Sequence, residues 1–476
     1  MSLPASPEKL GTPAASDANG ETKEASCGGN DEGALREECQ VYRFRWVVLI
    51  LFVVYSMSNA FQWIQFAIIN GLVGQFYGVS DGIVDMTSMI YMITYIPLIF
   101  PAMYFLDRFG LRKAVLIGSF GTALGSWIKV FSASPNLFPV AFIGQTVVAV
   151  SQIFILGIPP LLAAVWFGPS QVSSATAIGV FGNQLGVAAG FVLPPMLIKN
   201  GTQEEMAHDF QVMFIGTGCI TAVLFVAVIF LFRDKPPTPP SMSQMALLTA
   251  DKEPYVNSIK RLFTNKGYLL LLTSYGMNVG VFYAISTLLS SFILKYHPGK
   301  DEDTGRIGFM IVVFGMMGSV VSGLILDKTR RFKETTLVIY FLSFVGMVVY
   351  TFSLPHANHI AYMYVVFAAL GFFMTGYLPV GFEFAAEITY PESEGTSAGL
   401  LNASAQVFGI ILTAVTRLVF ESKVGDLGAN LLLCGILLMG VTMTALIKAD
   451  LRRTMAQRAS VASPPSYESS ATVPEP

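Results

Sequence analysis

Long apolar segments separated by short polar connections fill most of the chain. A helix needs about 20 apolar residues to cross the hydrocarbon core of a bilayer, and roughly twelve segments reach that length. They lie near residues 45–76, 84–106, 114–132, 138–167, 172–198, 211–232, 268–294, 307–326, 335–354, 361–384, 396–420 and 428–447. The pattern predicts an all-α integral membrane protein with about twelve transmembrane helices.

Polar stretches mark the boundaries of the expected domains. Residues 1–42 and 448–476 lack long apolar segments, and we expect them to form disordered cytoplasmic tails. A cytoplasmic connection at 233–266, with the string PPTPP at 236–240, separates an N-terminal six-helix bundle, 43–232, from a C-terminal one, 267–447.

A short polar loop repeats between the two halves. The loop DRFGLRK at 107–113 has a counterpart, DKTRRFK, that begins 220 residues later at 327, and each follows the second apolar segment of its half. Parallel repeats of this kind predict two pseudo-symmetric six-helix bundles, with a substrate site between them near the membrane midplane.

The composition excludes several classes of protein. Hydrophobic residues make up 53% of the chain and charged residues 13%, whereas a typical soluble domain has about 25% charged residues. The net charge of −2 provides no basic field for nucleic acid. Because the four cysteines are divided between the first tail and apolar segments, we expect no disulfide framework, metal site or cofactor. No catalytic constellation falls at cavity depth, so we do not expect an enzyme.

Lysine and arginine predict the orientation in the membrane. They concentrate in the loops after the second and eighth segments, in the central connection and at the start of the last tail. The positive-inside rule places these parts, and both termini, in the cytoplasm. The sequon Asn200-Gly201-Thr202 then lies outside, where it is either glycosylated or unused. We expect a monomer in the plasma membrane, with the mitochondrial or reticulum membrane as alternatives.

The centre of the expected cavity is uncharged. The first and fourth helices of each half have almost no ionisable residue at mid-depth, while Asp85 and Arg417 fall near the outer ends of their segments. An anionic substrate would need a buried Arg or Lys, and a proton-coupled carrier would need a buried carboxylate or His. The absence of such groups favours facilitated uniport of a cation or a neutral molecule.

Aromatic and amide side chains occupy the centre instead. Tyr283 follows Trp63 by 220 residues, the spacing of the repeat, so the two rings are expected at matching depth. Facing rings bind a quaternary ammonium by cation–π attraction of about 2 kcal/mol or more, although both could be packing aromatics. Uncharged amides nearby can bond a hydroxyl or an amine, or join neighbouring helices. These amides are Asn59, Gln62, Gln152, Gln184 and Gln406.

Several segments carry a family resemblance. The loop at 107–113 resembles the major facilitator superfamily signature, although the usual first glycine is missing before Asp107. More specific segments are NAFQWIQ at 59–65, QIFILG at 152–157, VWFG at 165–168, FGNQLG at 181–186, GFFMTGYLP at 371–379 and TYPESEG at 389–395. Together they resemble the feline leukaemia virus subgroup C receptor family of solute carriers.

The resemblance implies a carrier of choline and also of ethanolamine. Trp63 and Tyr283 would then cage the ammonium and Gln152 would bond the hydroxyl, while Gln62, Asn59 and Gln406 would complete the pocket. Haem transport, also attributed to this family, and a receptor-like protein without transport are the alternatives. An uncharged cavity without histidine disfavours haem at the central site.

Charged residues near the cytoplasmic surface are candidates for a gate. Asp107 with Arg108, and Asp327 with Arg330, can form ion pairs there, and Glu383, Glu387 and Glu394 supply further acidic partners. We expect salt bridges between the bundles that close this side during alternating access, the alternative being a role in topology and solubility alone.

The last tail holds a candidate partner site. The string Pro464-Pro465-Ser466-Tyr467 matches the P-P-x-Y pattern that docks WW domains, such as those of ubiquitin ligases, although short strings of this kind also arise by chance.

Overall fold

A computed structural model describes residues 41–168, 171–238, 240, 255–356, 360–392, 394–448 and 450–455. The string at 464–467 and most of both tails lie outside the described residues, as do the side chains of Asp107, Asp327 and Glu394. The WW-domain prediction is therefore left as a prediction.

Every regular element of the described chain is a helix. The N-terminal bundle consists of α2 (Arg45–Ile64), η1 (Ala67–Ile69), α3 (Asn70–Tyr77), α4 (Asp81–Phe109), α5 (Leu111–Val130), α6 (Phe138–Leu156), α7 (Ile158–Trp166), α8 (Val172–Leu197) and α9 (Gln203–Leu231). After α11 (Tyr255–Thr264), the C-terminal bundle consists of α12 (Lys266–Tyr296), α13 (Asp301–Thr329), α14 (Phe332–Ser353), η2 (Leu354–His356), α15 (Ile360–Thr389), α16 (Glu394–Glu421) and α17 (Gly425–Leu446).

The number of spans agrees with the hydropathy pattern. Eleven helices of the described chain are long and apolar enough to cross a membrane, α2 to α3 counting as one span. The 20-residue helix α5 is the twelfth member of the bundles and packs between α6 and α9. Its three basic residues, Arg112, Lys113 and Lys129, make it less apolar than the others.

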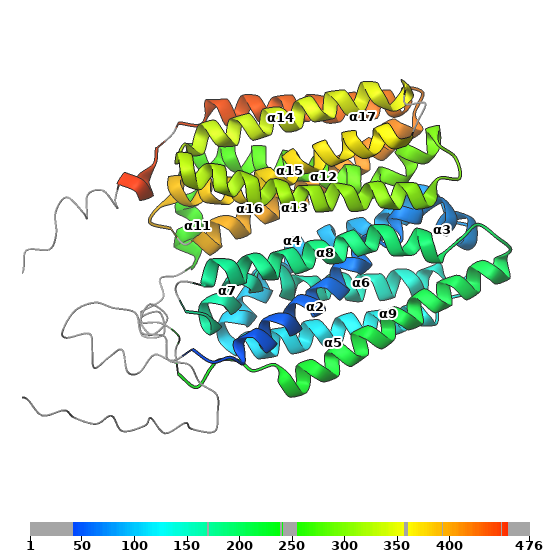
Figure 1. The fold of residues 1–476 in the computed structure, drawn as a ribbon, viewed down its shortest axis with the longest axis horizontal. Coiled ribbons are helices and arrows are strands. Elements are labelled where there is room, and N and C mark those ends of the chain that lie inside the picture. The colour runs from blue at the N-terminus through cyan, green and yellow to red at the C-terminus, as the bar shows by residue number, and fades with distance from the viewer. Residues whose placement is uncertain are drawn as a thin grey trace, which may run out of the picture.

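The two bundles lie side by side with their helices nearly parallel (Figure 1). They meet where α8 packs on α13, α4 packs on α16, and η1 packs on α12. A continuous buried cluster crosses this boundary, because Trp63, Phe191 and Met92 belong to the same core as Ile285 and Met374. The interface between the bundles is therefore a packed apolar core.

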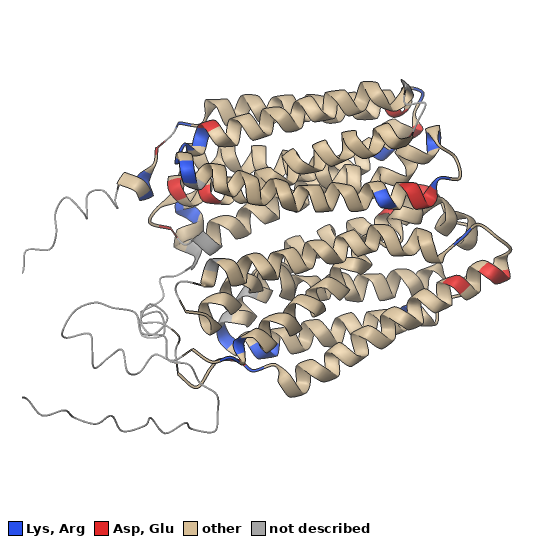
Figure 2. Cartoon of the chain, viewed as in Figure 1, with Lys and Arg blue, Asp and Glu red and all other residues tan. Residues whose placement is uncertain are grey.

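Charges gather at the two ends of the molecule and leave the middle apolar (Figure 2). We call the end that holds residues 41–45, 232–238 and 447–455 the tail end, and the end that holds the connections at 78–80, 131–137, 198–202 and 297–300 the far end. Asn200 lies exposed at the far end. Which end faces the cytoplasm stays a prediction of the positive-inside rule.

Candidate functional site

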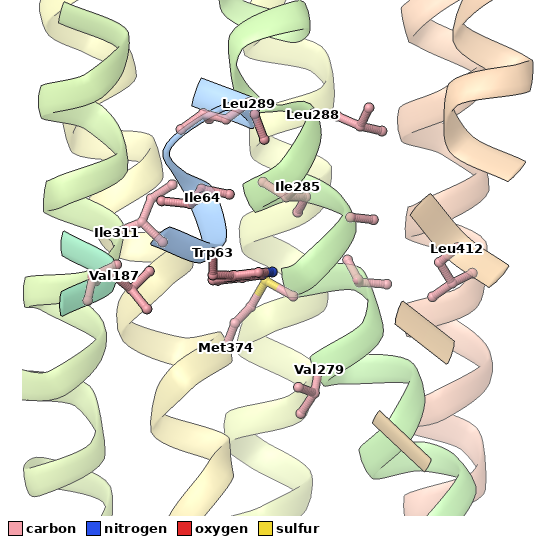
Figure 3. Packing of buried hydrophobic residues seen from close by; sticks show 14 of the residues in the cluster. Trp63, Ile64, Val187, Val279, Ile285, Leu288, Leu289, Ile311, Met374 and Leu412 are labelled. Atoms are coloured by element: carbon pink, nitrogen blue, oxygen red, sulfur yellow. The ribbon is translucent and has the colours of Figure 1, made fainter. Parts of the chain in front are cut away.

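A break in the first transmembrane span places Trp63 between the bundles. Helix α2 ends at Ile64, and the same span continues through η1 and α3. The Trp63 side chain is only 6% exposed. In Figure 3 its ring lies among apolar residues of both bundles, beside the sulfur of Met374.

Trp63 and Tyr283 are in direct contact. Their ring centroids are 5.6 Å apart and their planes meet at 74°, an edge-to-face arrangement that aromatic quadrupoles favour. The repeat thus brought together two rings from the first helix of each half, as their spacing predicts. Because the rings touch, a cation reaches their faces only when they separate or when it lies beside both.

A glycine on α16 gives Tyr283 its place. A Cβ atom at Gly409 would lie 2.9 Å from the Tyr283 ring and 2.8 Å from the Met92 sulfur, closer than real Cβ atoms approach other groups. Helices α4, α12 and α16 therefore meet at Gly409, directly behind the aromatic pair.

Three of the five predicted amides remain candidates for contact with a ligand. The buried Gln406 side chain lies within hydrogen-bonding reach of the Tyr283 hydroxyl. Gln152 and Gln184 are half-buried, and neither makes a hydrogen bond to another described residue. Their assignment to a substrate stays a prediction.

The other two amides bond inside the N-terminal bundle. The Asn59 amide nitrogen donates to the Thr122 hydroxyl at 3.0 Å and to the Val148 carbonyl at 3.1 Å. The Gln62 side-chain oxygen accepts from the Ser126 hydroxyl at 3.0 Å. These bonds join α2 to α5 and α6, which was the alternative role considered for these amides.

Sequence analysis missed a buried cation next to this site. Lys129 on α5 is 1% exposed, and its ammonium donates to Gln62 Oε1 at 2.6 Å and to Gln145 Oε1 at 3.0 Å. No carboxylate of the described chain forms an ion pair with Lys129. The prediction of an uncharged cavity centre concerned the first and fourth helices of each half and did not consider this lysine on α5. The signal was available, because Lys129 interrupts an apolar segment in the sequence.

A second buried cation pairs across the bundles. Arg417 on α16 is 5% exposed, and its Nε donates to Asp85 Oδ2 on α4 at 2.5 Å. Asn70 donates to the other Asp85 oxygen at 2.8 Å, and Arg417 also donates to the Ser291 hydroxyl at 2.9 Å. The sequence places Asp85 and Arg417 near outer ends of separate segments without indicating this pairing.

Other polar contacts between the bundles also lie toward the far end. Ser88 and Thr287 share a hydrogen bond of 3.0 Å, and Lys199 lies 3.8 Å from Glu302 at the surface. Together with the pair of Asp85 and Arg417, they hold the far end of the interface closed.

Three of the described gate candidates at the tail end contact groups from their own half of the chain. Arg108 donates to the Tyr104 hydroxyl at 2.7 Å, and Glu387 accepts from the Thr454 backbone and hydroxyl. Glu383 lies 3.9 Å from Arg453. Arg330 ends α13 in a left-handed conformation with φ of 53°. The proposed gate at this end stays a prediction.

An ion pair at the tail end fastens the connecting helix α11 to the C-terminal bundle. The Arg261 guanidinium and the Ser258 hydroxyl both donate to the carboxylate of Glu392, between α15 and α16. These bonds, those from Arg261 first, hold the pKa of Glu392 below its ordinary value of 4.5. Among the described residues, no group of three or more His, Cys, Asp or Glu side chains lies close enough together to hold a metal ion.

Comparison with known proteins places this geometry in a family. Residues 48–414 match the Major Facilitator Superfamily. The chain is 50% identical over 433 residues to the choline/ethanolamine transporter flvcr2a of Danio rerio, covering 90% of this chain and 92% of the relative. It is 48% identical over 422 residues to the choline/ethanolamine transporter FLVCR2 of Homo sapiens, covering 88% and 80%.

Solved structures share the fold at low identity. The fucose:proton symporter FucP in an outward conformation superposes with a TM-score of 0.61 at 12% identity, covering 85% of this chain and all of that one (100%). A bacterial homologue of the lysosomal transporter Spinster, inward-facing, gives 0.60 at 15% identity, covering 89% and 99%. Identities this low carry the fold and nothing about the substrate.

Proposed function

Because this chain belongs to the Major Facilitator Superfamily and, within it, to the FLVCR family of membrane transporters, we propose that it carries choline and ethanolamine by facilitated uniport. It is a transporter and not an enzyme. The observation that carries the choice of substrate is the aromatic pair of Trp63 and Tyr283, one ring from each bundle, with the uncharged amide of Gln406 beside Tyr283. The names of the relatives support the same substrate class.

The rings would act by cation–π attraction. A quaternary ammonium cannot donate a hydrogen bond. Its attraction to the faces of the two rings would therefore offset the cost of removing it from water, and this attraction contributes about 2 kcal/mol when water is excluded. The cation would lie within about 6 Å of both centroids, either beside the two rings or between them once they part. In the second case the binding step would be coupled to a small separation of the bundles.

The amides would form hydrogen bonds with the hydroxyl end of the substrate. Gln406 lies beside Tyr283, and Gln152 and Gln184 have unused donors and acceptors for a hydroxyl. Ethanolamine carries a primary ammonium with three donors, so it depends more on amide oxygens and less on ring faces than choline does.

The positions of the titratable groups support uniport. The buried carboxylate of Asp85 accepts hydrogen bonds from Arg417 and Asn70. A cationic substrate would still be driven inward by the membrane potential, worth about 2.3 kcal/mol per charge per 100 mV. The basic tail end would face the cytoplasm of a plasma-membrane protein, with Asn200 outside.

Alternating access would rock the two bundles about the aromatic pair. The far-end contacts of Asp85 with Arg417 and of Ser88 with Thr287 would open as the tail-end gate closes. The predicted gate residues Arg108, Arg330 and Glu383 would make their inter-bundle contacts only in that second state.

Radiolabelled choline uptake in cells that express equal surface amounts of each variant tests the proposal. We expect Trp63→Ala and Tyr283→Ala each to raise the choline KM about thirtyfold, the equivalent of about 2 kcal/mol. Trp127→Ala, at a half-exposed tryptophan of α5, is the matched control and should leave KM unchanged.

Two results would contradict the proposal. A normal choline KM in both ring variants would contradict the proposed aromatic binding site. Uptake that requires a sodium or proton gradient would contradict the proposed uniport.

A further inference from the structure

A buried ammonium without an anion has to be stabilised by other means. Removing an ammonium from water costs several kcal/mol even after relaxation of the protein. Lys129 meets two amide oxygens, and its Nζ lies 5.7 Å from the centroid of the Phe66 ring. Neutral oxygens and a ring face together supply the negative potential that a carboxylate would otherwise provide.

The end of helix α2 adds to that potential. Residues 61–64 form the last turn of α2, where backbone carbonyls lose their partners within the helix. The negative end of the helix dipole lies in that turn, and no basic residue of α2 itself complements it. Lys129 reaches this end from α5. Its stem fits because residue 144 is glycine, where a Cβ would lie 2.7 Å from Lys129 Cγ.

The same side chains hold the turn that carries Trp63. The Gln145 amide nitrogen donates to the Gln62 carbonyl at 2.7 Å and to the Thr87 carbonyl at 3.2 Å. Lys129 holds the side chain of Gln62 and faces the ring of Phe66, so it contacts the chain on either side of Trp63 to Gln65. Trp63 itself points to Tyr283 in the other bundle.

Freed carbonyls and helix ends form the sites where cation-driven carriers bind their coupling ion. In this chain an ammonium that is covalently part of the protein lies beside the end of α2 and donates to the side-chain oxygens of Gln62 and Gln145. A tethered cation cannot leave during the cycle, so it can hold the broken helix in one shape without supplying a driving force.

We propose that Lys129 is a positioning residue for the substrate-contacting turn of α2, a tethered cation that holds the Gln62 and Gln145 side chains at the break and fixes the orientation of Trp63. This inference rests on the proposed role of Trp63 in binding the ammonium of the substrate. It assigns Lys129 no contact with the substrate.

The first test reports on Trp63 without any substrate. In full-length protein with Trp46, Trp127 and Trp166 replaced by Phe, Trp63 is the single remaining tryptophan of the four. We expect Lys129→Met to shift its fluorescence emission to the red and to increase quenching by acrylamide. Lys113→Met, at an exposed lysine of the same helix, is the control and should change neither.

The second test separates positioning from folding. Lys129→Met removes the ammonium donor from the side-chain oxygens of Gln62 and Gln145, which keep only the bonds from Ser126 and Gln65. The double variant Lys129→Met with Gln62→Met removes one of these oxygens and should recover thermal stability. We expect the choline KM of the double variant to stay raised about tenfold, with Vmax within about twofold, because misplacement of a binding group by about 1 Å is costly.

The outcomes distinguish the two proposals. An unchanged Trp63 spectrum in Lys129→Met, or recovery of both stability and KM in the double variant, would show Lys129 to be a packing residue and would overturn the inference. Absence of choline uptake in the wild type together with a shifted Trp63 spectrum would instead defeat the choline assignment and keep the positioning role.

Discussion

The two buried cations of the described chain, Arg417 and Lys129, are stabilised in different ways. Arg417 pairs with Asp85 on the opposite bundle, whereas Lys129 bonds only to neutral amides within its own bundle. A charge pair across a moving interface can be separated and rehydrated when the bundles part. A cation bonded only to amides of its own bundle does not have to lose its partners when the bundles part. The first therefore suits a contact that changes with conformation, and the second suits a fixed support.

The largest effect is expected from breaking the charged pair. Arg417→Leu leaves Asp85 buried and unpaired, which costs about 3–5 kcal/mol in comparable cases. We expect a marked loss of thermal stability in detergent and at least about a tenfold loss of choline uptake. Combining it with Asp85→Asn should restore most of the stability, because no buried charge is then left.

Arg306→Leu is the control for this substitution. Arg306 is an exposed arginine at the same end, and its ion pairs with Glu302 and Asp303 stay within α13. If Arg417→Leu and Arg306→Leu destabilised the protein equally, the contact across the bundles would have no special role.

A smaller loss of stability is expected at the neutral network. Lys129→Met removes one donor from each of two neutral amide oxygens and leaves no unpaired charge, so the cost should be about 1–3 kcal/mol. The thermal midpoint should fall by less than in Arg417→Leu, measured in the same detergent. A fall as large as that of Arg417→Leu would erase the distinction between the two sites.

The region between the two cations can be tested sterically. Gly409→Ala would press a methyl group against the Tyr283 ring and the Met92 sulfur, at a cost of about 1 kcal/mol or more. We expect the choline KM to rise about fivefold or more for such a cost. Gly399→Ala on the same helix meets no atom within 4 Å and should transport normally. Equal KM in both variants would mean that Tyr283 does not need its present position.

The smallest effect concerns an ion pair with an exposed partner. Because the folded-state pKa of Glu392 is below 4.5, its pair with Arg261 stabilises the fold above that value and loses its contribution as the pH falls through the lower folded pKa. We expect Arg261→Gln to lower the thermal midpoint slightly near neutral pH, by no more than about 1 kcal/mol of stability. The difference from the wild type should vanish in acid, and a difference that grew in acid would contradict the assignment.

Part of the site could be predicted because it follows from local pattern. Trp63 and Tyr283 are separated by 220 residues, the spacing of the internal repeat, and equivalent positions of a repeat lie at the same depth in the membrane. The partners of Asn59 and Gln62 could not be predicted in the same way, because a side-chain amide on a helix can bond to any of several neighbouring elements. Only the packing of α5 and α6 showed that both are used within one bundle.

Hydropathy and repetition along the sequence determined a helical membrane protein with two related halves, because the cost of exposing polar backbone in lipid leaves few alternatives. The tertiary structure alone decided which charges meet. Asp85 and Arg417 are 332 residues apart, and Lys129 reaches Gln62 across 67 residues. Such contacts depend on the rotation of each helix about its axis and on how the bundles dock, which no local pattern of apolar residues specifies.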